Sequence, residues 1–333
     1  MKGKMALRRK GKISGLQLGA GAMALGALSY CVVSRFLTRK LVSVALDRAM
    51  PKSSAISRRW ISGSNDCDAL LDTCQKAANR LLSEDCETIR LRAQDGTPLV
   101  GHLHTCLQPK RIILAMHGWR SSWNRDFGLI DDFWTRSDCS VLYAEQRGQN
   151  NSGGKYMGFG LTERYDCLTW VTWVQKRFGK KIPIYLAGIS MGASTVLMAG
   201  GLALPKQVHG IMADCGYTSP YHIWQHVVTK NLHLSYKARA RMADRLCRKR
   251  IQMGPQDYST LEALRTGQIP VLFIHGSEDH FVPISMTYEN YAACKAPKHL
   301  LVVPGADHGM SYLVDSKSYE NAMIAFWKAY DEG

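Results

Sequence analysis

The chain has 333 residues and a formal net charge of +16, a length that suits one catalytic domain with an extension. The charge is uneven, because residues 1–60 hold 13 Lys and Arg against one acidic residue and leave only about +4 for the other residues. A nearly balanced globular part with a basic tail argues against a DNA-binding face, so we expect no nucleic-acid partner.

The N-terminal segment predicts a membrane anchor. Basic residues between positions 2 and 12 precede 22 uncharged residues (13–34), and further basic residues follow at 35, 39 and 40. This length is enough for a helix to cross a hydrocarbon core. We therefore expect residues 1–40 to form a basic N-terminus and a single-pass transmembrane helix that places the protein at a membrane. The positive charge on both sides leaves the side of the catalytic domain open, and a cleaved signal peptide is the alternative.

Residues 41–85 are predicted to form a linker and an amphipathic helix, because apolar residues from Leu70 to Leu82 recur at helical spacing. Two β-like runs, 87–92 and 99–107, then flank Asp95-Gly96, which is a hairpin pattern. His102 and His104 alternate on one face of the second strand, and we expect them to be solvated rather than metal ligands. No cofactor or metal is expected, because the ten cysteines contain no Cys-x-x-Cys pair.

Alternating strands and helices over residues 86–333 predict one α/β catalytic domain. Near-continuous apolar runs occupy 112–116, 141–144, 182–187, 208–213, 271–274 and 300–303, and helical patterns occupy 163–178, 193–202 and 319–330. Apolar strands that alternate with helices indicate a mostly parallel sheet with helices on both faces.

The most informative stretch is Gly188-Ile189-Ser190-Met191-Gly192, which lies between an apolar strand and a small-residue helix. In this setting Gly-x-Ser-x-Gly is the pattern of a nucleophile elbow, with Ser190 at the tip of a strained turn. The glycines are needed because a Cβ at Gly188 or Gly192 would crowd the neighbouring strand and helix. Ser190 is therefore the candidate nucleophile.

A serine nucleophile needs a histidine base and an acid that orients it, in the chain order Ser, acid, His. His308 follows the strand at 300–303 and is the best base. Acidic candidates lie after three strands, and these are Asp214, Glu278, Asp279 and Asp307. The carboxyl ends of parallel strands share one edge of a sheet, so these loops should lie together.

These motifs together resemble the α/β-hydrolase superfamily, over residues 87–330. Within it the chain looks most like membrane-anchored bacterial hydrolases related to serine aminopeptidases, through Gln146-Arg147-Gly148 and Asp214-Cys215-Gly216. The resemblance implies that Asp279 is the acid, because members carry it in Gly-x-x-Asp-x-x-Val-Pro, and positions 276, 279, 282 and 283 match.

Two backbone N–H groups are expected to form the oxyanion hole, from Met191 after the nucleophile and from Trp119 after His117-Gly118. Residues 216–268 occupy the usual place of a lid, here short. A helix is expected at about Tyr236–Arg250, with seven basic residues against one acid, Asp244. Such a helix can meet an anionic membrane or an acidic substrate, and a solvated face is the alternative.

The predicted function is a serine hydrolase that cleaves an ester or thioester of a small-molecule or acyl substrate through an acyl-enzyme. Two alternatives remain open, an aminopeptidase-type amide hydrolase and a catalytically silent membrane-anchored binding protein of the same fold. Because no expected site residue precedes Leu41, a chain lacking residues 1–40 is predicted to keep its activity.

Overall fold

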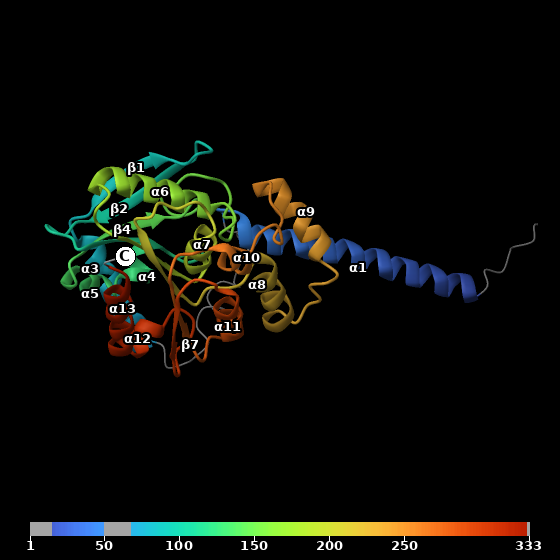
Figure 1. Ribbon diagram of the computed structural model, residues 1–333. Coiled ribbons are helices and arrows are strands. Elements are labelled where there is room, and N and C mark those ends of the chain that lie inside the picture. The colour runs from blue at the N-terminus through green and yellow to red at the C-terminus, as the bar shows by residue number, and fades with distance from the viewer. Residues whose placement is uncertain (1–14, 50–67, 332–333) are drawn as a thin grey trace, which may run out of the picture.

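The computed structural model describes residues 15–49 and 68–331, and its centre is a twisted eight-stranded sheet (Figure 1). The strand order is β1-β2-β4-β3-β5-β6-β7-β8. Strand β2 is antiparallel to β1 and to β4, and all later pairs are parallel. The mostly parallel sheet predicted from the apolar runs is confirmed. The strands are β1 (Glu87–Arg92), β2 (Pro98–His104), β3 (Arg111–Met116), β4 (Cys139–Glu145), β5 (Ile184–Ile189), β6 (Val208–Asp214), β7 (Val271–Gly276) and β8 (Lys298–Val303).

Helices bury both faces of the sheet, as expected for strands that are apolar on each side. One core cluster joins the sheet to α6 (Glu163–Phe178), α7 (Met191–Ala199) and α10 (Thr260–Thr266), with α11 (Ile284–Ala293) packed against β7. The cluster on the other face includes residues of α3 (Asp68–Ser83), α4 (Trp123–Phe127), α5 (Asp131–Arg136) and α13 (Ser316–Tyr330). The short helix α12 (Ser311–Val314) precedes α13.

A third apolar cluster lies outside the two sheet faces and joins the lid segment, residues 216–268, to the N-terminal helix. The lid elements in it are α8 (Pro220–His226), η1 (Val227–Asn231) and α9 (Ala240–Ile251). The observed α9 is the basic helix expected at about Tyr236–Arg250, shifted by a few residues at its start. It packs against α1 (Gly15–Leu46), which extends away from the domain (Figure 1).

The transmembrane anchor predicted for residues 1–40 is not supported. Within the part of the chain that the structure describes, no helix combines the length and the apolar character needed to cross a membrane. Helix α1 contains Arg35, Arg39 and Lys40, and it continues through residue 40 into the predicted linker. Its last turns bury Val42 and Leu46 in the third cluster. Residues 1–14 and 50–67 lie outside the described residues.

The two histidines of β2 are not the solvated residues that the alternation suggested. His102 Nε2 lies 2.8 Å from Glu145 Oε1, and its ring stacks on Trp123. His104 Nδ1 lies 3.0 Å from Asp131 Oδ1. This hydrogen bond raises the pKa of His104, so its protonated form is favoured beside the buried carboxylate. The face of β2 that carries them is covered by helices, and the imidazoles serve as partners for buried acids.

Candidate active site

Ser190 stands at the junction of β5 and α7 in a backbone conformation that ordinary residues avoid, with φ 57° and ψ −116°. Its N–H donates to the carbonyl of Asp214 at 2.9 Å, which ties the turn to the neighbouring strand. A Cβ on Gly192 would collide with the carbonyl of Met116, and one on Gly188 would collide with the backbone of Gly192. The two glycines thus permit the close approach of strand and helix that pushes the serine outward.

His308 joins the serine to an acid from another loop. Its Nε2 lies 2.9 Å from Ser190 Oγ, and its Nδ1 lies 2.7 Å from Asp279 Oδ2. Both distances are ordinary for hydrogen bonds. Because the carboxylate only accepts, the Nδ1 atom carries the proton and leaves Nε2 to accept from the serine hydroxyl. The structure therefore brings together the three residues predicted from the sequence.

Asp279 is held in place by its own loop. Its Oδ1 accepts from the N–H groups of Phe281 and Val282, at 2.9 and 2.8 Å. The buried His275 lies 3.1 Å from Oδ2 and also contacts Thr287 Oγ1 at 2.7 Å. The carboxylate thus has one orientation and presents Oδ2 to His308. His275 therefore stabilises the loop that carries Asp279.

The rival acids do not contact the His308 ring. Asp214 is buried and accepts from Ser311 Oγ at 3.1 Å. Asp307 accepts from the backbone N–H of His308 at 2.7 Å and so supports the loop rather than the imidazole. Glu278 is exposed, and its carboxylate accepts a long hydrogen bond of 3.5 Å from Ser277 Oγ. Asp279 alone among these four lies within hydrogen-bond distance of a His308 ring nitrogen.

The negative charge of Asp279 favours transfer of the Ser190 hydroxyl proton to His308. Burial works against ionisation of Asp279, but His308 and His275 outweigh it and hold the pKa of Asp279 below its usual value. Burial likewise opposes a charged His308, yet the negative charge and the hydrogen bond of Asp279 raise its pKa above the usual value. An ionised acid beside the imidazole stabilises the imidazolium that forms when the serine loses its proton.

Cys215 lies beside the site, although the sequence assigned it no role there. Its Sγ lies within 4.8 Å of the facing atoms of Asp279 and His308, and its φ is 49°. Burial raises the pKa of its thiol to about 12, so the group is neutral at physiological pH. We read it as a packing partner of the imidazole. The signal that could have found it is its place directly after β6, at the sheet edge where the site gathers.

The loop after β3 leaves one N–H group free beside the elbow. Gly118 N–H donates to Asp126 Oδ2 at 2.6 Å, and Arg120 N–H donates to Gln149 Oε1 at 2.5 Å. Between them Trp119 has no acceptor for its N–H among the described residues, and neither has Met191 at the first position of α7. A rigid loop with a free N–H group is what an oxyanion hole requires, and these are the two donors expected from the sequence.

The loop after β3 also forms hydrogen bonds with the end of α1. The Arg120 guanidinium donates to the carbonyls of Val44 and Asp47, at 2.7 and 2.6 Å. The last carbonyls of a helix have no partner within it and carry partial negative charge, so a cation satisfies them. Trp119 Nε1 adds a hydrogen bond of 2.9 Å to the Ala45 carbonyl. From the other side, Arg250 of α9 pairs with the Asp47 carboxylate at 2.6 Å.

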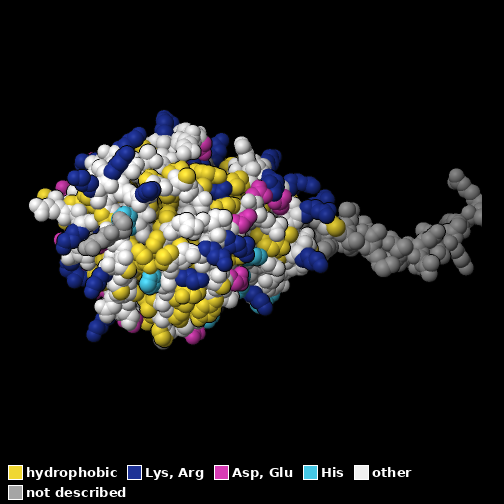
Figure 2. Space-filling view, in the orientation of Figure 1, with side chains coloured by type: hydrophobic (Ala, Val, Ile, Leu, Met, Phe, Trp, Pro, Cys, Tyr) yellow, Lys and Arg dark blue, Asp and Glu magenta, His cyan; other side chains and the backbone are white. Residues whose placement is uncertain are grey.

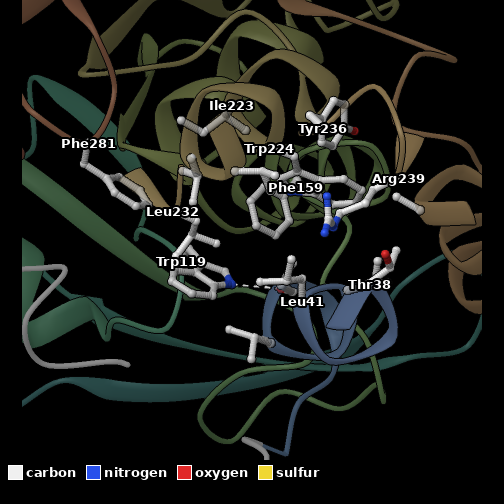
Figure 3. Close-up of a pocket in the computed structure, with 16 residues that line it drawn as sticks. Thr38, Leu41, Trp119, Phe159, Ile223, Trp224, Leu232, Tyr236, Arg239 and Phe281 are labelled. Atoms are coloured by element: carbon white, nitrogen blue, oxygen red, sulfur yellow. Dashed lines mark hydrogen bonds between the residues drawn. The ribbon is translucent and has the colours of Figure 1, made fainter. Parts of the chain in front are cut away.

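An apolar pocket of about 90 Å³ opens beside the catalytic loops (Figure 3). Its walls come from the end of α1, from the lid and from the loops that carry Trp119, Phe159 and Phe281. Phe281 packs on the His308 ring with centroids 5.0 Å apart. Phe159 has a φ of 54°, and the buried Glu163 carboxylate holds its loop by accepting from the N–H groups on either side. The pocket therefore lies next to His308.

The basic residues of the lid serve several purposes. Arg248 pairs with Asp244 and Asp257, Arg250 pairs with Asp47, and Arg239 is buried. Lys237, Arg241, Arg245 and Lys249 are exposed and form no ion pair within the part of the chain that the structure describes. In Figure 2, Lys and Arg side chains gather around the part of the surface where α9 meets α1, with acidic side chains between them. Binding of this face to an anionic membrane stays a prediction.

That a chain lacking residues 1–40 keeps its activity stays a prediction, and the buried contacts of α1 with the domain lie mainly in its last turns, beyond residue 40. Pocket-lining residues begin at Thr38, and the buried Val42 and Leu46 each stabilise the domain by about 1.5–3 kcal/mol. We expect removal of residues 1–48 to lower the melting temperature and to reduce kcat/KM for a soluble ester by about tenfold or more, because the Trp119 loop loses its support. Removal of residues 1–30 is the control and should leave both values near those of the full chain. Equal activity of the two truncated proteins would show that α1 does not support the site.

Comparisons with known proteins agree with this arrangement. Residues 107–259 match the family model described as serine aminopeptidase, S33. The uncharacterized protein YqkD of Bacillus subtilis is 27% identical over 191 residues, which cover 56% of this chain and 61% of that protein. The match therefore spans about three fifths of this relative's length.

Solved structures share the fold at low identity. The esterase Pf2001 of Pyrococcus furiosus superposes with a TM-score of 0.62 at 20% identity, over 75% of this chain and 93% of the esterase. An acylaminoacyl peptidase of Pyrococcus horikoshii gives 0.56 at 15% identity, over 75% of this chain and 43% of the peptidase. The elbow, the strand order and these superpositions show that the chain has the α/β-hydrolase fold.

Proposed function

We propose that the protein is a serine hydrolase that cleaves an ester or thioester through an acyl-enzyme on Ser190. The observation that carries the proposal is the continuous hydrogen-bonded chain from Ser190 through His308 to Asp279, at the carboxyl edge of the sheet. The same chain argues against a catalytically silent binding protein, because binding alone requires no such alignment.

The reaction follows from the roles of these groups. Ser190 Oγ attacks the carbonyl carbon of the substrate while His308 Nε2 takes the hydroxyl proton. The oxyanion accepts hydrogen bonds from the N–H groups of Trp119 and Met191. His308 then gives its proton to the leaving oxygen or sulfur, the bond to the leaving group breaks, and the acyl group stays on Ser190. In the second half, His308 removes a proton from water as the water oxygen attacks the acyl carbon. The bond to Ser190 Oγ then breaks, His308 returns the proton to that oxygen, and the acid is released.

The apolar pocket beside the site supports an acyl chain as the group that binds there. Phe281, Phe159 and Trp119 offer aromatic surface to it, and α8 and α9 add aliphatic side chains. Burial of a chain on such surfaces contributes about 0.8 kcal/mol for each CH₂ group. An aminopeptidase is the second candidate, since the matched family model is described as a serine aminopeptidase.

The bond that is cleaved can be identified with the purified full-length protein. The panel consists of p-nitrophenyl esters, acyl-CoA thioesters and aminoacyl amides, together with a fluorophosphonate probe. The proposal predicts covalent labelling and higher kcat/KM for esters and thioesters than for amides. Preferential cleavage of aminoacyl amides would favour the aminopeptidase, and absence of both labelling and turnover would favour the binding protein.

A further inference from the structure

Three buried polar groups on the wall of the apolar pocket have no hydrogen-bond partner. They are Arg239 Nε, Tyr236 Oη and Trp224 Nε1, on side chains of residues that are only 6%, 3% and 8% exposed. All three residues line the pocket, together with Leu41 and Phe159. Buried polar groups in native proteins are normally satisfied, and an orphaned group costs about 1–3 kcal/mol. Three orphans in one otherwise apolar cavity suggest that a ligand completes them.

Arg239 is the only charged residue of the three. Its Nη1 donates to the Ser235 carbonyl at 2.7 Å, and among the described residues its guanidinium forms no ion pair. Two arginines of the adjoining helix α9 are paired, since Arg248 contacts two aspartates and Arg250 contacts Asp47. A buried cation usually has a counter-charge, because desolvation without one is costly.

The guanidinium lies where a bound chain would reach it. In Figure 3 Arg239 extends from the lid into the space between Phe159 and the side chains of Thr38 and Leu41 on α1. Phe281, which packs on the catalytic His308, lines another part of the same pocket. A chain that starts at the catalytic loops and follows the apolar walls can therefore end at Arg239.

We propose that this pocket binds an acyl chain that carries a carboxylate at its far end, with Arg239 as the residue that pairs with it. The inference rests on the proposed serine hydrolase and names its substrate class, a monoester or monothioester of a long-chain dicarboxylic acid. Arginine matches the geometry of a carboxylate through two parallel hydrogen bonds. Tyrosine and tryptophan add a hydroxyl and an indole N–H, so the three orphaned groups are all donors that suit an acceptor-only group.

The test compares two esters of equal chain length, p-nitrophenyl decanoate and the mono-p-nitrophenyl ester of decanedioic acid. The measured quantity is the ratio of kcat/KM for the dicarboxylic ester to kcat/KM for the neutral ester. In the wild-type protein this ratio should exceed one. In Arg239→Met it should fall by about tenfold or more, as expected when a charged hydrogen-bond donor is lost.

Two further variants distinguish recognition of the carboxylate by Arg239 from the loss of any positive charge and from the loss of folded protein. Arg241→Met removes an exposed arginine of the adjoining helix α9 and should leave the ratio and the neutral-ester activity unchanged. Tyr236→Phe removes only a hydroxyl and should lower the ratio by about threefold. If the melting temperature shows that Arg239→Met is unfolded, the ratio measured for Tyr236→Phe tests the carboxylate subsite instead.

The outcomes are distinct. A wild-type ratio of one or less, or an equal fall of the ratio in Arg241→Met, would overturn the proposal while leaving the hydrolase intact. If neither ester is cleaved, the proposed function fails, and calorimetric binding of decanoate and of the uncharged decan-1-ol to the full-length protein then tests the pocket alone. Tighter binding of decanoate, lost in Arg239→Met, supports the carboxylate subsite. Equal binding of the two compounds refutes it.

Discussion

Replacement of Ser190 by alanine should reduce ester hydrolysis on the order of 10⁴-fold or more, because no other group can form the acyl-enzyme. Fluorophosphonate labelling should disappear with it. The fold should remain, since the change removes one hydroxyl whose hydrogen bond is to His308. The measurements are initial rates with a soluble ester, labelling followed by gel fluorescence, and the melting temperature.

A matched control is available one turn along α7. Ser194 is buried and its hydroxyl contacts the backbone of Tyr217 at 3.1 Å, away from the His308 ring. Ser194→Ala should lower the melting temperature but keep the labelling. The assignment of Ser190 as the nucleophile would be wrong if labelling survives in Ser190→Ala. It would also be wrong if labelling is lost in a folded Ser194→Ala.

Replacement of Asp279 by asparagine should lower kcat by about 10³–10⁴-fold. Asparagine keeps an oxygen for the N–H groups of Phe281 and Val282, so the turn should hold. Its amide, however, presents N–H donors to His308 Nδ1 and favours the tautomer in which Nε2 carries the proton. In that tautomer Nε2 cannot accept the proton of Ser190, which explains the expected loss.

The same variant should change the dependence of the rate on pH. Only neutral His308 can take the proton, so kcat/KM rises as pH increases through the pKa of His308. In the wild-type protein this pKa is raised, with Asp279 among the causes, and the rise should be centred above the usual histidine value of about 6.5. Without the carboxylate the pKa falls, and the residual activity should rise at lower pH.

Two neighbouring carboxylates provide the controls for this experiment. Asp307→Asn leaves the Asp279–His308 hydrogen bond in place, and should move the pH profile much less than Asp279→Asn. Asp214→Asn tests the acid that the sequence left as a rival. A loss of rate and a shift of the pH profile in Asp214→Asn, with neither in Asp279→Asn, would transfer the orienting role to Asp214.

The local features of this protein could be derived from its sequence because their causes are local. Continuous apolar runs predict buried parallel strands wherever helices alternate with them. The elbow around Ser190 is readable because only glycine at 188 and 192 lets strand and helix approach so closely. The loops of Asp279 and His308 could be placed at one sheet edge, since the carboxyl ends of parallel strands meet there. Choice among the acids still needed the family resemblance, because residues in neighbouring loops look alike in a sequence.

Tertiary contacts decided the rest. The uncharged run and its basic flanks suggested a membrane anchor. In the structure, however, the end of α1 packs on the domain and lines the pocket. This packing depends on contacts with Arg120 and Arg250, which are distant from α1 in the sequence. Arg239 and Arg241 are two residues apart and equally basic in the sequence, yet one is buried against the pocket and the other is exposed. His102 and His104 likewise depend on acids from other elements. Burial and pairing are set by neighbours distant in sequence, so a pattern along the chain determines which element a residue belongs to, and only the packed fold determines what that residue contacts.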